Sequence, residues 1–194
     1  PIRRAYLANR ASGVSAVDVA DPRNPRVIDR KSHVLGETRG VEVAADRLFA
    51  FLWQPHCPCI GHLAEVDLSR PGLAMTASLT RAREPVDIER YEHFVYLVDK
   101  EHGIDVVDVT TERRPLVAGE YDAAGDPVDF DTSGTTGLVA DANLGLQLVG
   151  LETPWEPQTL REVALGRGAS GVAAADGLAH VLVPTDERNE VDQV

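Results

Sequence analysis

Apolar and polar residues alternate over short stretches along most of the chain, which is the pattern of β-strands with one buried face. The segment 85–123 shows this most clearly, with the strand-like stretches "PVDIER", "HFVYLVD", "IDVVDVT" and "LVAGEYDA" separated by the turns "KEHG" and "TERRP". No segment of about twelve residues or more keeps the 3.6-residue period of an amphipathic helix. The pattern therefore predicts an all-β protein.

The strand pattern recurs along the chain. Four stretches match one another: "GVEVAA" at Gly40, "PVDIER" at Pro85, "PVDFDT" at Pro127 and "GVAAAD" at Gly171. A second series keeps step with the first: "AVDVADP", "EVDLSRP", "VVDVTTERRP" and "QLVGLETP". Four short strands in a repeat of about 42 residues are typical of a β-propeller blade. Packing blades around an axis covers both apolar faces of each small sheet.

The repeats predict a single β-propeller domain over residues 1–194. We expect a partial blade at 1–39, full blades at 40–84, 85–126 and 127–170, and a partial blade at 171–194. Both partial blades contain the second strand type, "RRAYLAN" in the first and "AHVLV" in the last, so they cannot complete each other. We therefore expect an incomplete ring, with about four to five blades in this chain, that missing sequence or another chain completes.

The quoted stretches resemble a known family. "AYLANRASGVSAVDVADPRNP", "FVYLVDKEHGIDVVDVTTERRP" and "GLVADANLGLQLVGLETPWEP" look like repeats of the LVIVD-repeat β-propellers, and the likeness extends over essentially the whole chain. Members are mostly secreted or surface proteins of bacteria and archaea. The resemblance implies an extracytoplasmic location, periplasmic, secreted or cell-surface. It says little about activity, because members share structural residues rather than a catalytic set.

The composition narrows the range of partners. The chain is 43% hydrophobic and 26% charged, as in a globular protein, and its formal net charge is −12. Nucleic acids and anionic membrane surfaces require a basic surface, so neither is an expected partner. No apolar run is long enough to predict a membrane span.

The stretch "QPHCPCIGH" is unlike the rest of the sequence, because it holds both cysteines. It extends a loop that is short in the other repeats. His56, Cys57, Cys59 and His62 offer two thiolates and two imidazoles, which suit zinc or copper, and His102 in the corresponding loop of the next blade is a further candidate ligand. The spacing of the cysteines is C-x-C, not the C-x₂-C of ordinary zinc sites. Two alternatives stay open: a disulfide that involves Cys57 and Cys59, and free thiols in an ordinary turn.

The same loop belongs to one end of the predicted propeller. One face of a propeller carries the connections from second to third strand and those from the fourth strand to the next blade. Binding residues concentrate in such loops. The residues expected on this binding face are Trp53, Arg39, Arg83, Glu84, Asp126, Asp141 and Arg167.

No nucleophile, phosphate-loop or metalloprotease motif occurs in the sequence. The expected function is therefore a non-catalytic propeller module that binds a partner protein or forms part of a larger assembly. The alternative is a copper- or zinc-dependent oxidoreductase that uses the "HCPCIGH" insert. In outline that alternative resembles the propeller thiol oxidases related to selenium-binding proteins.

Metal analysis of the purified protein and of a Cys57→Ser variant distinguishes the readings of the insert. A metal site predicts bound zinc or copper that the substitution removes. Metal-free protein with both thiols oxidised would contradict the ligand interpretation and support the disulfide.

Overall fold

The computed structural model describes residues 3–32, 36–54, 60–81 and 85–185. Over these residues the chain forms seventeen β-strands and no helix, which confirms the predicted all-β class. All strand pairs are antiparallel and neighbours in sequence. Within the described ranges there is accordingly no helix long and apolar enough to cross a membrane.

The strands form five small sheets, three of which have four strands. The first sheet holds β1 (Arg4–Ala8), β2 (Val14–Asp18) and β3 (Arg26–Lys31). The second holds β4 (Glu37–Ala44), β5 (Arg47–Gln54), β6 (Ile60–Asp67) and β7 (Ala74–Arg81). The third holds β8 (Pro85–Tyr91), β9 (Phe94–Asp99), β10 (Gly103–Asp108) and β11 (Leu116–Tyr121). The fourth holds β12 (Pro127–Ser133), β13 (Thr136–Asp141), β14 (Gly145–Gly150) and β15 (Gln158–Val163), and the fifth holds β16 (Gly171–Ala175) and β17 (Leu178–Leu182).

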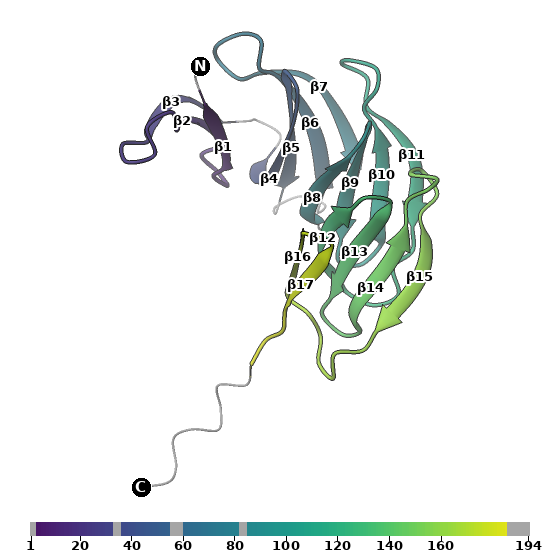
Figure 1. Ribbon diagram of the computed structural model, residues 1–194. Helices are drawn as coiled ribbons and strands as arrows, with labels where there is room; N and C mark the ends of the chain where they lie inside the picture. The colour runs from purple at the N-terminus through teal and green to yellow at the C-terminus, as the bar shows by residue number, and fades with distance from the viewer. Residues whose placement is uncertain (1–2, 33–35, 55–59, 82–84, 186–194) are drawn as a thin grey trace, which may run out of the picture.

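The five sheets follow one another along an arc (Figure 1). The first strands of the later sheets, β4, β8, β12 and β16, lie on its inner side, and β7, β11 and β15 lie on its outer side. The sheets β1–β3 and β16–β17 are the two ends of the arc. Each sheet therefore has a sequence neighbour against which one or both of its faces can pack.

Two backbone features recur at the same place in each repeat. A two-residue turn joins the first and second strands, and its first residue has a positive φ: Ala45 (56°), Glu92 (53°), Gly134 (60°) and Asp176 (52°). A β-bulge interrupts the pairing of the last two strands immediately before a valine: Val17, Val66, Val107 and Val149. Because a bulge re-aims the strand that follows it, its recurrence shows that the sequence repeat is a repeat of backbone geometry.

The aspartates that recur at one place in the repeat cap turns. The carboxylates of Asp18, Asp67 and Asp108 each accept a hydrogen bond from the backbone N–H two residues later, at 2.9, 2.8 and 2.7 Å. The fourth repeat has Gly150 at this place. These aspartates are thus structural.

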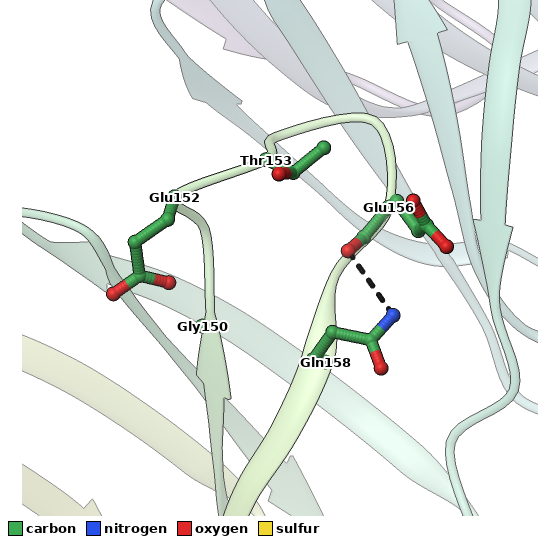
Figure 2. Close-up of a pocket in the computed structure, with 5 residues that line it drawn as sticks. All are labelled: Gly150, Glu152, Thr153, Glu156 and Gln158. Atoms are coloured by element: carbon green, nitrogen blue, oxygen red, sulfur yellow. Dashed lines mark hydrogen bonds between the residues drawn. The ribbon is translucent and has the colours of Figure 1, made fainter.

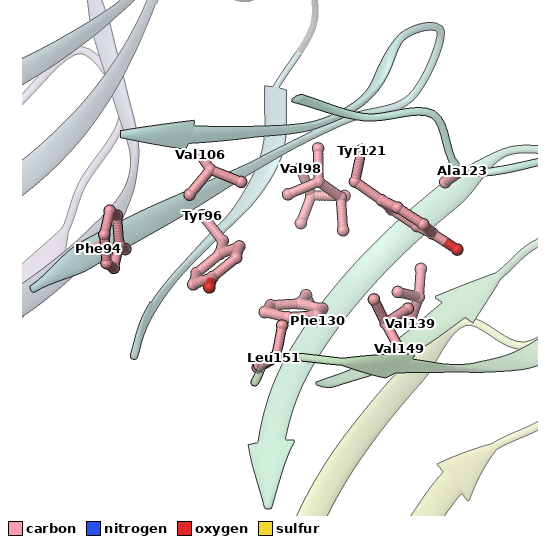
Figure 3. Close-up of a cluster of buried hydrophobic side chains, with 11 residues drawn as sticks. Phe94, Tyr96, Val98, Val106, Tyr121, Ala123, Phe130, Val139, Val149 and Leu151 are labelled. Atoms are coloured by element: carbon pink, nitrogen blue, oxygen red, sulfur yellow. The ribbon is translucent and has the colours of Figure 1, made fainter. Parts of the chain in front are cut away.

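The core consists of apolar side chains between successive sheets. The cluster between the third and fourth sheets contains Tyr96, Val98, Phe130, Val139 and Leu151 among others (Figure 3). The rings of Tyr96 and Phe130 lie 5.1 Å apart and are tilted to each other, which is a favourable aromatic geometry. Similar clusters join the first sheet to the second, the second to the third, and the fourth to the fifth.

Buried polar groups also join the sheets. The Tyr96 hydroxyl donates to the carbonyl oxygen of Pro154 in the next sheet at 2.8 Å. Glu65, which is buried on β6, accepts the backbone N–H of Arg113 from the β10–β11 connection. These bonds fix how neighbouring sheets sit against each other, because an unpaired buried polar group is costly.

Pairing in the structure refines the alignment of the repeats. Counted back from the hairpin turn, Gly40 is equivalent to Asp87, and Thr38 is equivalent to Pro85. The sequence comparison had matched Gly40 with Pro85. The strand β4 accordingly begins at Glu37, inside the segment 1–39. All three first strands carry a bulge at the same place, so the bulge does not cause this difference of two residues. Strand alternation has a period of two, so "GVEVAA" and "PVDIER" still match when they are aligned two residues out of register.

Removing the Tyr96 hydroxyl tests the contact between the third and fourth sheets. Because Tyr96→Phe leaves the Pro154 carbonyl without its donor, we expect the free energy of unfolding to fall by about 1–2 kcal/mol in a denaturant titration. The control is Tyr91→Phe, which packs against the same cluster with no described partner for its hydroxyl, and it should change stability by less than about 0.5 kcal/mol. Equal effects of the two substitutions would contradict the assignment.

Candidate functional site

The expected binding face corresponds to one end of the sheets. Connections between second and third strands leave each sheet at the same end as connections to the next sheet, because strand direction alternates. Backbone hydrogen bonds tie these connections together: Arg10 with Thr38, Ala142 with Asp126, and Ala169 with Asp141. We call this the loop end.

Arg39 and Trp53 meet at the loop end. The central carbon of the Arg39 guanidinium lies 3.7 Å from the centroid of the Trp53 ring, which is close cation–π geometry. Arg39 is the bulge residue of β4, between Thr38 and Gly40. The equivalent bulge residues of β8 and β12 are Val86 and Val128, which pack against apolar clusters. Arg39 is therefore a local departure from the repeat.

The β5–β6 hairpin extends beyond the equivalent hairpins. Both of its strands have eight residues, whereas β9, β10, β13 and β14 have six. The extra rungs pair Trp53 with Gly61 and Gln54 with Ile60. At the place of Leu52, the other hairpins have Asp99 and Asp141, which turn the chain. The loss of this turn-forming carboxylate accounts for the longer hairpin.

The two described histidines of the predicted metal set lie on different sheets. His62 is on β6, where Thr80 Oγ1 lies 3.2 Å from its Nδ1, and burial lowers the pKa of its imidazole. Its rung partner Leu52 belongs to the cluster that faces the first sheet. His102 lies in the β9–β10 turn of the third sheet, with its Nδ1 2.9 Å from Asp99 Oδ1. The third sheet covers the face of the second sheet that is opposite the first sheet. Over the described ranges no group of three or more His, Cys, Asp or Glu side chains could hold a metal.

Asp126, Asp141 and Arg167 belong to neighbouring connections of the loop end. Asp141 is fully buried and caps its own turn by accepting the backbone N–H groups of Asn143 and Leu144. Asp126 accepts a hydrogen bond from the Asn143 side chain at 2.8 Å. Arg167 donates to the carbonyl oxygen of Pro184 at 3.4 Å. Asp141 has the burial and the hydrogen bonds of a structural residue, whereas Asp126 is available to solvent.

The remaining predicted site residues lie outside the described residues. They are His56, Cys57, Cys59, Arg83 and Glu84. The metal, disulfide and free-thiol interpretations of the insert all stay predictions.

A row of carboxylates on the inner strands was missed in the sequence. Its members are Glu42 on β4, Asp87 and Glu89 on β8, and Asp129 and Asp131 on β12. Burial, followed by the nearby charges of Glu42 and Asp131, raises the pKa of Glu89 to about 8. Burial and a hydrogen bond with Asp129 raise the pKa of Asp87. Acidic residues at alternate positions of "PVDIER" and "PVDFDT" were the available signal.

Three of these carboxylates join successive inner strands. The Oδ2 atoms of Asp87, Asp129 and Asp131 accept the backbone N–H groups of residues 43 positions later: Phe130 at 3.0 Å, Val172 at 2.7 Å and Ala174 at 2.7 Å. The inner edge of each strand otherwise has no ladder partner, so these bonds satisfy N–H groups that a sheet edge leaves open. This structural role explains Asp87, Asp129 and Asp131.

A pocket in the β14–β15 connection carries no clear chemistry. It is lined by Gly150, Glu152, Thr153, Glu156 and Gln158 (Figure 2). Its two acidic side chains lie on opposite sides of the connection, and Gln158 donates to the backbone carbonyl of Glu156. The pocket is at the end opposite the loop end, because it follows a third strand.

Comparisons with solved structures show the fold. The chain is similar to a functionally unknown protein from Desulfotomaculum acetoxidans DSM 771, with 11% identity, 94% of this chain and 62% of that chain covered, and a TM-score of 0.78. It is similar to the computationally designed Ika8 protein, with 8% identity, 93% and 52% covered, and a TM-score of 0.67. It is also similar to the computationally designed Ika4 protein, with 11% identity, 79% of this chain and 94% of that chain covered, and a TM-score of 0.57. The chain thus spans about half to two-thirds of the length of the first two proteins.

At these identities the likeness concerns the fold alone. No protein-family model and no curated protein matches the sequence. The fold is therefore shared with known proteins, while the function has to be argued from the surfaces of this chain.

The raised pKa of Glu89 predicts a pH-dependent effect of Glu89→Gln. A carboxyl whose folded pKa is raised stabilises the fold most below its unfolded pKa of about 4.3, and this contribution is lost as the pH rises through about 8. Glutamine imitates the protonated form, so at pH 5, where the unfolded glutamate has begun to ionise, the variant should be only slightly more stable than the parent protein. At pH 9 it should be more stable by about 1 kcal/mol, a value reduced to allow for solvent screening. Denaturant titrations at both pH values measure this.

The exposed Glu156→Gln provides the control, and it should change stability by less than about 0.5 kcal/mol, as is usual for a surface substitution. A stabilisation by Glu89→Gln that is the same at pH 5 and pH 9 would exclude a raised pKa.

Proposed function

We propose that this chain is a non-catalytic, extracytoplasmic β-propeller module that binds a partner protein or forms part of a larger assembly. Its five sheets are the blades of an incomplete ring, which further blades, from the same polypeptide or another chain, continue. The repeated four-stranded sheets, the shared bulges and the arc of inner strands support this reading. The location rests on the sequence resemblance to LVIVD-repeat proteins.

The observation that carries the proposal is the exposure of β17. Counted from the hairpin turn, Leu178 and Leu182 are equivalent to Phe94 and Val98 of β9. The β9 residues are 9% and 0% exposed, whereas Leu178 and Leu182 are 62% and 65% exposed. The same strand position is thus covered inside the arc and uncovered at its end.

The first sheet shows the same contrast at the other end. Leu7 on β1 is equivalent to Leu97 on β9, and their exposed fractions are 48% and 1%. Full burial of a leucine contributes about 1.5–3 kcal/mol, so both ends of the arc leave favourable contacts unmade. What distinguishes these leucines from ordinary exposed apolar residues is that the equivalent positions are buried inside the arc.

The repeat indicates what would cover β17. In the second, third and fourth sheets the equivalent strand pairs with a third strand of alternating apolar residues, such as "GIDVVD" in β10 or "GLQLVG" in β14. A strand of this pattern on the open edge of β17, followed by a further sheet, would bury the exposed leucines. The proposal therefore specifies β-strand addition at this end.

Charged substitutions on β17 test the assembly. A charge in a buried interface is costly, so Leu178→Asp and Leu182→Asp should weaken self-association or partner capture by tenfold or more. Native mass spectrometry and sedimentation measure the complexes formed by the intact polypeptide.

The matched control is Leu160→Asp on β15, where a leucine of similar exposure lies on an outer strand, a position that β7 and β11 also occupy in their sheets. This variant should assemble as the parent protein does. A closed monomeric ring in an experimental structure, or equal assembly of all three variants, would reject the proposal.

A further inference from the structure

The pair formed by Arg39 and Trp53 has features that the fold does not require. Strands β8 and β12 form the same bulge with valine, so the backbone at this place needs no arginine. Arginine at a position that the repeat fills with valine breaks the local rule, and such departures concentrate at functional sites. A bulge also re-aims the side chain that it carries.

The charge of Arg39 has no acceptor in the described protein. Its Nε is enclosed by protein atoms and has no hydrogen-bond partner. Two other arginines have an enclosed nitrogen of this kind, but each has a further polar contact: Arg47 with Glu65 at 3.9 Å, and Arg90 with the carbonyl of Glu92 at 2.8 Å. Arg39 has only the face of Trp53.

The geometry leaves one edge of the guanidinium available. The indole of Trp53 covers one face and the protein encloses Nε, while the residue as a whole keeps part of its surface exposed. Two parallel N–H groups at this edge match the two oxygens of a carboxylate. Partial removal of Arg39 from water strengthens such a pair relative to one in open solvent.

We propose that Arg39, held on Trp53, is a binding site for a carboxylate of a partner polypeptide. This site would be one contact within the proposed interaction function. The inference that the carboxylate belongs to a polypeptide rests on that proposed function. Because the chain carries a net charge of −12, a strongly acidic partner would be repelled at long range. The carboxylate therefore belongs to a segment that is otherwise neutral or basic.

Fluorescence of Trp53 reports binding directly. The Trp155→Phe substitution leaves Trp53 as the one tryptophan of the chain. Two blocked tripeptides, Lys-Glu-Lys and Lys-Gln-Lys, and acetate are titrated at constant ionic strength. We expect a saturable change with the glutamate peptide, and an affinity at least tenfold lower for the glutamine peptide, because it lacks the charged acceptor. Comparable binding of acetate would support the same carboxylate site and identify its source as a small anion.

Substitutions at Arg39 provide the decisive comparison. Arg39→Val introduces the residue of the equivalent strands, so the fold should be kept while affinity falls at least tenfold. Arg39→Lys keeps the charge without the planar fork and should bind with intermediate affinity. Arg161→Val, on the exposed strand β15, is the control and should bind as the parent protein does.

Absence of a saturable change with both the glutamate peptide and acetate, or an equal change in Arg39→Val, would overturn the proposal. The assembly measured with Leu178→Asp is a separate readout. Carboxylate binding without assembly would reject the proposed function alone, and assembly without carboxylate binding would reject this site alone.

Discussion

Mutual coverage of small sheets is the constraint on which the rest of this structure depends. A four-stranded antiparallel sheet with two apolar faces is not stable alone, and each sheet here buries its faces against its sequence neighbours. The constraint fails at the two ends of the arc, where β1 and β17 occupy a strand position that is buried elsewhere and leave their leucines exposed. The exposed leucines at these two ends are the observation on which the proposed assembly rests.

A second constraint on the inner side of the arc is that unpaired N–H groups of the first strands need hydrogen-bond acceptors. Each first strand has an unpaired edge, and carboxylates of the preceding strand accept its N–H groups at intervals of 43 residues. Gathering carboxylates in this way raises the pKa of Asp87, Glu89 and Glu42, with burial as the largest cause. The inner row is thus both a connector of sheets and a source of pH-dependent stability.

The loop end is where the chain departs from its own repeat. The β5–β6 hairpin lacks the aspartate that closes the corresponding turns, and the bulge of β4 carries Arg39 in place of valine. These two changes bring a cation and an indole together on one sheet. Because the bulges and turns recur from sheet to sheet, the neighbouring sheets show which residues the backbone alone requires, and this makes such departures informative.

The sequence by itself determined the all-β class and the order of strands within each repeat, because alternation and repeat length are properties of the chain alone. Only the tertiary structure decided the register of β4, the contact of Arg39 with Trp53, the burial of Asp141 and the row of carboxylates. The alternation of a strand looks the same after a shift of two residues, so only the pairing with β5 decides the register of β4. Residues about 43 positions apart become neighbours only when successive sheets pack together.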